Sequence, residues 1–531
     1  MNSDVGVRRS PFWTVTLRGQ AQYVASTARS FGQRHMPLSL LRLRLTLVSL
    51  LAVSFLGALD NTVVSTSLAT VAGQLGALQH MGWVVVGYTL ASTVLIPVLG
   101  KLGDVVGPRL VFVSSLVLFL VASLACGFAA SMGWLIACRV VQGMSSAGLQ
   151  LMSQTIIAQV AAPRARPRYM AIVGAAFPVA ILIGPVLGGL ITDSWGWPWV
   201  FWVNLPVGAV ALVLAVLALP HLEGTGAGRR FDLPGAVAFT FVLVALVLGV
   251  SWAGDPSAGL AATGAFAAAV VGFALFLLAE RRAAEPLIPL RHFANRTVAA
   301  GTVISSIVGI GLFSITSYLP TYFQMAYRTS ATVSGLVPIA TVFGMLVSNL
   351  LTGFLASRTG RYRAFPIIGT SVGTLGLGIM ALLPPALPLW VPMAVMALVG
   401  LGTGAFMSLI IAVVQNAAPR TETGVVTATV NLTRQVGSTL ATAIIGGVIG
   451  FGVAARLPAG TDAADLTPQA VHAADAALQD AVAGIYHDVF APIFGALALT
   501  YALGIVAALL LPHGRLSDEL EPSPTHEPLS A

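Results

Sequence analysis

The chain has 531 residues, of which 56% are hydrophobic and 9% are charged. Soluble globular domains carry about 25% charged residues, so this composition excludes a soluble domain and predicts an all-α polytopic membrane protein. The net charge of +8 alone would also suit a nucleic-acid partner. The basic residues, however, gather in alternate loops between apolar segments, which assigns the charge to membrane topology and argues against nucleic acid.

The two cysteines, Cys126 and Cys138, both lie inside apolar runs. Thiols in such runs usually pack as small buried hydrophobic groups. The sequence therefore suggests neither a disulfide framework nor a metal ligand set, and we expect no cofactor.

Apolar runs with charged or Gly/Pro breaks predict fourteen membrane spans, each long enough to cross a hydrocarbon core of about 30 Å. We place them at residues 45–71, 81–100, 110–130, 133–160, 168–191, 198–220, 233–252, 258–279, 297–325, 332–356, 364–384, 388–416, 430–454 and 489–512. An even number of spans puts both termini on one side of the membrane.

The distribution of arginine identifies that side. The segment before Leu45 carries Arg8, Arg9, Arg18, Arg29, Arg34, Arg42 and Arg44, and every second loop after it is also basic. By the positive-inside rule both termini are cytoplasmic. The 27 basic residues include one lysine, Lys101, and this bias with abundant Ala and Gly suggests a high-GC bacterial genome and hence a bacterial inner membrane.

Asp60 stands near the middle of the first span. A carboxylate there costs about 2.5 to 3.5 kcal/mol on insertion scales, so it predicts a proton site, a counter-ion or a binding group. Arg139 lies inside the fourth span, in RVVQG. Either it snorkels to the outer interface, or it faces the bundle interior, where motion relative to Asp60 would change the proton affinity of that carboxylate.

The loop GKLGDVVGPRL, residues 100–110, joins the second and third spans at the cytoplasmic side. Its glycines permit a tight turn and close helix approach, and its charged residues favour a network. The residues concerned are Gly100, Lys101, Gly103, Asp104, Gly107 and Arg109. A second copy, GFLASRTGRY at residues 353–362, places Ser357 where the first has Asp104 and predicts two similar halves.

The fifth span contains IGPVLGG, with Gly184, Pro185, Gly188 and Gly189. Glycines four residues apart give a small face for helix contact, and Pro185 favours a kink because it lacks a backbone donor. The pattern predicts a bent helix that rocks against a neighbour.

Polar side chains in other spans are candidates for a substrate pathway. They are Asn61, Gln142, Tyr318, Tyr322, Gln324 and Arg434. An interfacial aromatic belt explains the tyrosines equally well. Arg434 lies at the cytoplasmic interface if its span begins at Val436, or about 18 Å deep if the helix begins near Glu422.

LDNTVV, GKLGDVVGPRL, RVVQG and IGPVLGG together resemble the successive signature motifs of the major facilitator superfamily. Their order and the span count are similar to its fourteen-spanning drug:proton antiporters, which include multidrug and quaternary-ammonium exporters. WGWPWVFWVNLPVG, PLIPLRHFANRT and YLPTYFQ also match, so the resemblance covers residues 45–512.

The resemblance implies two six-helix halves, 45–220 and 297–512, with two inserted helices and linkers at 221–296 and cytoplasmic tails at 1–44 and 513–531. It further implies that Asp60 carries the proton, that Arg139 assists, that Asp104 and its neighbours gate the inner face, and that IGPVLGG marks export. Two departures stand out: Asp60 is the only acid deep in a span, and Pro108 replaces a residue that is often Arg or polar.

The leading hypothesis is therefore a proton-coupled antiporter, not an enzyme, that exports amphipathic and cationic drugs as a monomer in the lipid bilayer. The alternative is an exporter of an endogenous secondary metabolite or lipid with the same mechanism. The chain lacks a G-x-x-x-x-G-K-[ST] loop, which disfavours an ATP-driven pump. The loop 457–487 is expected to be external, either as a short amphipathic helix or as disordered chain, with no assigned chemistry.

Overall fold

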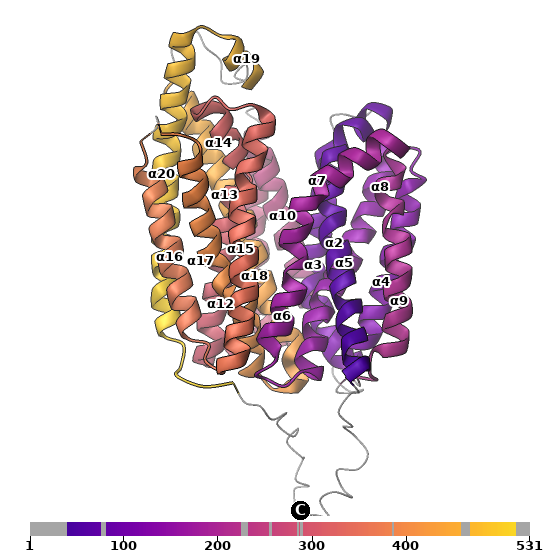
Figure 1. Cartoon of the computed structure of the whole chain (residues 1–531). Helices are drawn as coiled ribbons and strands as arrows, with labels where there is room; N and C mark the ends of the chain where they lie inside the picture. Colours follow the sequence, from indigo (N-terminus) through magenta and orange to yellow (C-terminus); the bar gives the residue numbers. More distant parts are fainter. Residues whose placement is uncertain are drawn as a thin grey trace, which may run out of the picture. The chain divides into compact units, whose positions relative to one another are not determined.

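The computed structural model describes residues 40–75, 81–222, 224, 232–253, 258–283, 286, 290–384, 387–457 and 468–516. Most of the two expected tails and part of the loop 457–487 lie outside these residues. From Leu45 onward these described residues form one compact unit. In Figure 1 its helices up to α9 gather in one bundle and those from α12 onward in a second.

The first bundle contains eight helices among the described residues. They are α2 (Leu40–Leu75), α3 (Met81–Val106), α4 (Pro108–Gly127), α5 (Met132–Val160), α6 (Arg166–Gly174), α7 (Ala176–Trp195), α8 (Pro198–Trp202) and α9 (Asn204–Ala218). Helix α5 packs against both α3 and α4. Local chemistry sets the ends: the Ser131 side chain accepts from the backbone N–H of Trp134 at the start of α5, and Pro108 begins α4.

Two helices, α10 (Leu233–Ala253) and α11 (Gly259–Arg282), follow the first bundle in the chain. They pack on each other, with the rings of Phe239 and Phe276 centred 5.3 Å apart. Helix α10 also contacts α3 of the first bundle and α18 of the second.

The second bundle begins with a broken span. Its elements are η3 (Leu290–Ala294), α12 (Arg296–Val308), the π-helix η4 (Gly309–Phe313), α13 (Ser314–Thr316), α14 (Leu319–Ala326), α15 (Ala331–Thr359), α16 (Ala364–Leu382), α17 (Trp390–Asn416), η5 (Arg420–Glu422), α18 (Thr423–Ala454), α19 (Pro468–Ala473) and α20 (Ala476–Leu509). Helix α17 packs against α15 and α16, and α20 against α16.

Several expected boundaries differ from the structure. The fifth span consists of α6 and α7 with a break at Ala175, because Pro178 has no N–H to donate to the carbonyl of Gly174. Helix α7 itself continues through Pro185. The ninth span is interrupted by η4, and α20 begins at Ala476 rather than at 489, because the Asp475 carboxylate caps the backbone N–H of Leu478 at 2.8 Å.

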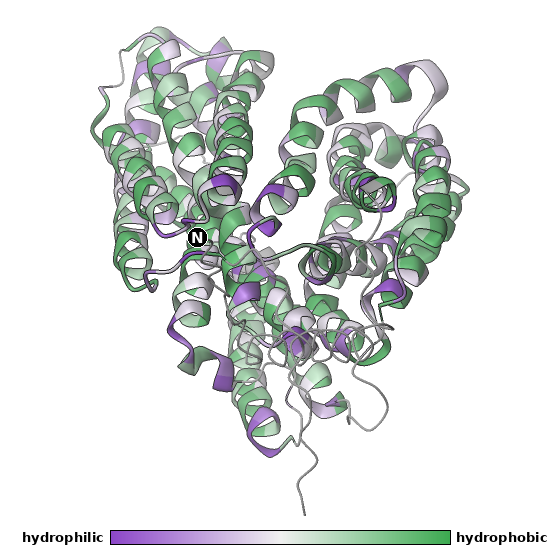
Figure 2. Ribbon diagram, turned by 60° about the horizontal axis from the view of Figure 1, so that its bottom comes forward, coloured by the Kyte–Doolittle hydropathy of each residue, from purple (hydrophilic) through white to green (hydrophobic). Residues whose placement is uncertain are grey.

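Twelve helical segments among the described residues are long and apolar enough to cross a membrane. The spans expected at α5 and α10 are not among these twelve. Helix α5 carries several polar side chains, and within the 21 residues of α10 the described side chains form the apolar segment Leu233–Gly249. Figure 2 shows hydrophobic residues along the outer helices. Leu260, Leu382 and Phe451 are 90%, 84% and 81% exposed, as a lipid-facing surface requires.

Candidate functional site

The Asp60 carboxylate lies inside the first bundle, where it is 1% exposed. Its Oδ2 accepts a hydrogen bond from Arg139 Nη1 at 2.5 Å. Its Oδ1 accepts from Gln142 Nε2 and from Asn204 Nδ2, both at 2.8 Å. Three donors from α5 and α9 thus converge on one carboxylate of α2, which compensates the cost of burying its charge.

A second layer of contacts fixes these donors. Gln142 Nε2 also donates to Ser123 Oγ of α4 at 2.7 Å, and Arg139 Nε donates to the carbonyl of Val84 at 3.3 Å. The Arg139 side chain is fully buried, and its Nη2 has no hydrogen-bond partner among the residues that the structure describes. Snorkelling of Arg139 to the interface is therefore excluded in this conformation.

Tyr88 separates the ion pair from the space between the two bundles. Its ring lies 4.2 Å from the Arg139 guanidinium carbon. Its hydroxyl donates to Ser146 Oγ at 2.7 Å and to the carbonyl of Gly57 at 3.3 Å. Tyr88, Ser146 and Gly57 all line the central cavity, so the ion pair sits directly behind the cavity wall.

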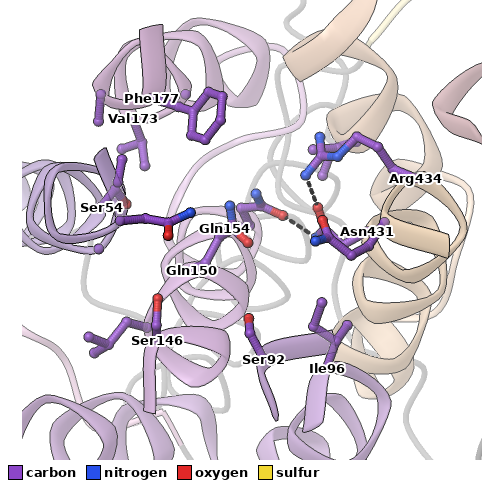
Figure 3. A pocket seen from close by; sticks show the side chains of 18 of the residues that line it. Ser54, Ser92, Ile96, Ser146, Gln150, Gln154, Val173, Phe177, Asn431 and Arg434 are labelled. Atoms are coloured by element: carbon purple, nitrogen blue, oxygen red, sulfur yellow. Dashed lines mark hydrogen bonds between the residues drawn. The ribbon is translucent and has the colours of Figure 1, made fainter. Parts of the chain in front are cut away.

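The central cavity has a volume of about 260 Å³ and is lined by both bundles. Figure 3 shows its close-up, with Gln150 and Gln154 of α5 extending toward Asn431 and Arg434 of α18. Its polar lining includes Ser54, Asn61, Thr89, Ser92, Ser146, Gln150, Gln154, Ser408, Asn431, Arg434, Gln435 and Ser438. A wall that mixes hydroxyls and amides with apolar groups suits an amphipathic small molecule.

Of the six candidate pathway residues, Asn61 and Arg434 line this cavity. Gln142 instead belongs to the Asp60 network, and the tyrosines lie elsewhere. Tyr322 is 1% exposed and packs with its ring centre 4.7 Å from that of Phe490. Tyr318 donates to the carbonyl of Thr442 at 2.9 Å.

Gln324, the last of the six, lies near the end of α14. Its backbone carbonyl is 3.2 Å from His472 Nε2 in α19. Arg434 is deep because η5 and α18 begin the helix at Arg420–Thr423, which selects the deeper of its two expected positions.

Asp104, at the end of α3, contacts the start of α18. Its two carboxylate oxygens accept from the backbone N–H groups of Gly424 and Val425 at 2.8 and 2.9 Å. Gly100 permits this approach, because a Cβ there would lie 2.6 Å from the Ala428 Cβ. The Asp104 carboxylate lies at the N-terminal, positive end of the α18 dipole, and this contact holds the two bundles together.

The remaining residues of the 100–110 loop have separate contacts. Gly103 packs against Met152, and Lys101 is 6% exposed. Gly107 has a φ of 98°, which turns the chain into α4. Arg109 does not join Asp104, contrary to the expected network: its Nη2 donates to the carbonyl of Val216 at 2.9 Å, because the turn directs it toward α9.

The repeated loop makes the corresponding contact from the other bundle. A Cβ at Gly353 of α15 would lie 2.3 Å from the Ala171 Cβ of α6. The carbonyl of Ser357, in the place of Asp104, accepts from Arg164 Nε at 3.1 Å. Gly360, with a φ of 70°, ends α15 as Gly107 follows α3. Each bundle therefore sends one glycine-containing helix end against the other.

The glycines of IGPVLGG pack against the helix that carries Asp60. A Cβ at Gly184 would lie 2.1 Å from Thr62 Oγ1, and one at Gly188 would lie 2.2 Å from Thr66 Oγ1. Gly189 faces open space, with nothing within 4 Å of its position. The contact lets α7 approach α2 one turn from the buried carboxylate.

Three residues around the Asp60–Arg139 pair were not identified from the sequence, namely Ser123, Asn204 and Tyr88, and neither were the cavity residues Gln150, Gln154 and Asn431. Asn204 and Ser123 are polar groups inside apolar spans, which is the available signal, but packing hydroxyls look the same in sequence. Among the described residues no group of three or more His, Cys, Asp or Glu side chains is placed to hold a metal ion.

Two bundles of membrane-length helices, a polar cavity between them and a buried ion pair behind its wall are the architecture of a membrane transporter of small molecules. Residues 50–442 match the model of the Major Facilitator Superfamily, and the chain belongs to that family.

The chain is 32% identical over 407 residues to the Multidrug transporter protein MdtP of Bacillus subtilis, covering 76% of this chain and 75% of that protein. It is 31% identical over 415 residues to the Acurin A biosynthesis cluster MFS-type transporter of Aspergillus aculeatus, covering 76% and 74%. Its fold is similar to that of the proton:xylose symporter XylE, with a TM-score of 0.58, 14% identity and coverage of 90% and 97%.

Proposed function

We propose that the chain is a proton-coupled exporter of amphipathic small molecules in the bacterial inner membrane. The observation that carries this proposal is the buried pair of Asp60 and Arg139 behind the wall of the central cavity. A carboxylate with a matched donor set inside a membrane bundle is a group that can hold or release one proton. The relative named a multidrug transporter supports export of drug-like compounds.

The proposal includes fourteen spans. Helix α5, with 29 residues, packs between α3 and α4, and α10, with 21 residues, packs on α11. Adding these two helices to the twelve apolar segments gives fourteen. An even count puts both termini on one side, the positive-inside rule supports the cytoplasm as that side, and fourteen spans fit the proposed drug:proton antiporter type.

The transport cycle is proposed to be alternating access. The contacts of Asp104 with α18 and of Arg164 with α15 close the bundles at the end that the positive-inside rule assigns to the cytoplasm. In the open-outward conformation Asp60 takes up a proton as substrate leaves, and in the inward one it releases the proton as substrate binds. One charge crossing 100 mV contributes about 2.3 kcal/mol.

The sequence predicts a preference for cationic drugs. Among the described residues, however, no acidic side chain lines the cavity to bind a cation. Export of an endogenous secondary metabolite is the second candidate function, and the relative whose name places it in a biosynthesis cluster favours it.

The test is drug-driven proton release from proteoliposomes. The substrates are a rhodamine with a free carboxylate and its methyl ester, and a trapped pH-sensitive dye reports protons. We expect Asp60→Asn to abolish proton release, whereas Asp193→Asn, at an exposed position near the end of α7, retains it. Proton-coupled transport that persists in Asp60→Asn would overturn the proposal, and uncoupled transport unchanged from the wild type would indicate a passive carrier.

A further inference from the structure

We propose that Arg434 is the docking site for an anionic group, such as a carboxylate, on the amphipathic molecule that occupies the central cavity. This inference rests on the proposed function, because it names the chemical class of the substrate. The proposed substrate differs from the cationic drugs that the sequence predicts. The reason is the sign of the charge that faces the cavity.

Arg434 is the only charged residue among the described residues that line the cavity. The other polar groups on the wall are hydroxyls and amides. Asp60, the one carboxylate nearby in the first bundle, lies behind Tyr88 and is neutralised by Arg139. A ligand in the cavity therefore meets a single positive charge and no negative one from the described lining residues.

The Arg434 side chain has no counter-ion in the part of the chain that the structure describes. It is 8% exposed, and its Nη2 donates to the neutral Asn431 Oδ1 at 2.5 Å. Among the described residues no carboxylate is paired with it. A buried, unpaired cation is costly, and its remaining donors are suited to bidentate binding of a carboxylate or phosphate. An anionic ligand in the cavity would supply the missing negative charge beside Arg434.

The surrounding contacts hold the guanidinium in place. Asn431 Nδ2 donates to Gln154 Oε1 at 2.7 Å and to the carbonyl of Thr427 at 3.1 Å, so both bundles fix the residue that orients Arg434. The backbone of α18 is also held, because a Cβ at Gly309 would lie 1.9 Å from the Arg434 carbonyl oxygen. The π-helix η4 thus packs tightly behind the arginine.

Apolar side chains of α6 and α7 form one region of the cavity wall. In Figure 3 Arg434 points into the space between α18 and the side chains of Phe177 and Gln154, and Val173 lies beside Phe177. Ile96 and Met170 also line the wall. A ligand with an anionic end at Arg434 and a ring system against Phe177 would satisfy both regions, which fits an amphipathic carboxylate.

The experiment measures equilibrium binding of the two rhodamines to the purified full-length protein in phosphatidylcholine nanodiscs by fluorescence anisotropy. The dyes differ only in having a free carboxylate or its methyl ester. We expect the wild type to bind the carboxylate form about tenfold more tightly, as one charge-assisted bidentate contact would give. Arg434→Gln should remove this preference, and Arg434→Lys should retain part of it.

A second variant keeps Arg434 and pairs its charge with a carboxylate of the protein. Asn431→Asp places a carboxylate beside the guanidinium as an internal counter-ion, so the preference should disappear with Arg434 intact. Retained thermal unfolding temperatures establish that the variants are folded. A wild type that prefers the ester or binds both dyes equally overturns the proposal, as does an unchanged preference in folded Arg434→Gln and Asn431→Asp.

Two further arms separate related explanations. Asp60→Asn is expected to keep the binding preference even though it loses proton release, so failure of the coupling proposal is distinguishable from failure of this one. Nanodiscs with phosphatidylglycerol test whether an anionic lipid competes. Displacement of the dye from the wild type but not from Arg434→Gln supports the same anion site with a lipid headgroup as occupant, and no displacement supports an anion from solution.

Discussion

The contact of Asp104 with α18 predicts a measurable shift in the balance between closed and open conformations. Asp104 is 4% exposed, and its carboxylate accepts from two N–H groups in the first turn of α18. Hydrogen bonds to a charged group contribute about 1.5 to 3 kcal/mol each, and the charge adds about 0.3 to 1 kcal/mol with the helix dipole. Asp104→Asn keeps one acceptor oxygen and loses the charge.

We therefore expect Asp104→Asn to weaken the closed state by about 2 kcal/mol, which is about thirtyfold in the closed-to-open ratio. The assay is double electron–electron resonance between spin labels at Leu110 and Leu510, which are 61% and 64% exposed and belong to different bundles. The labels require prior replacement of Cys126 and Cys138.

The expected result is a new population at longer distance in Asp104→Asn, reconstituted in the same lipid as the parent. Asp193→Asn makes the same chemical change on α7, away from the contact with α18, and should leave the distances unchanged. If the distance distribution of Asp104→Asn matches that of the parent, the contact does not stabilise the closed state and the reasoning is refuted.

Three more substitutions test the packing around the Asp60 carboxylate. Gly184→Val should destabilise the bundle and lower transport, because its Cβ would meet Thr62 Oγ1 at 2.1 Å, whereas Gly189→Ala, with nothing within 4 Å, should behave as wild type in thermal unfolding and dye efflux. Asn204→Leu removes one of the hydrogen-bond donors to Asp60 and should lower the free energy of unfolding by about 1 to 3 kcal/mol. A melting temperature equal to that of the wild type would show that this donor contributes little to stability.

The sequence predicted the membrane class and the residues whose chemistry conflicts with an apolar span. Asp60 and Arg139 are identifiable because a charged side chain inside a membrane span is costly whatever the tertiary structure. The glycines of IGPVLGG are identifiable because their spacing follows the helical period, and the repeated loops predict two similar halves through local sequence alone.

Only the tertiary structure decided which groups meet. The partner of Asp104 begins 320 residues later in the chain, and Asn204 reaches Asp60 from a helix whose sequence gives no sign of that contact. The depth of Arg434 depends on where α18 begins. Its position on the cavity wall depends on how the two bundles pack against each other. Local sequence fixes helix periods and costly side chains, whereas the neighbours of a side chain follow from the packing of distant helices.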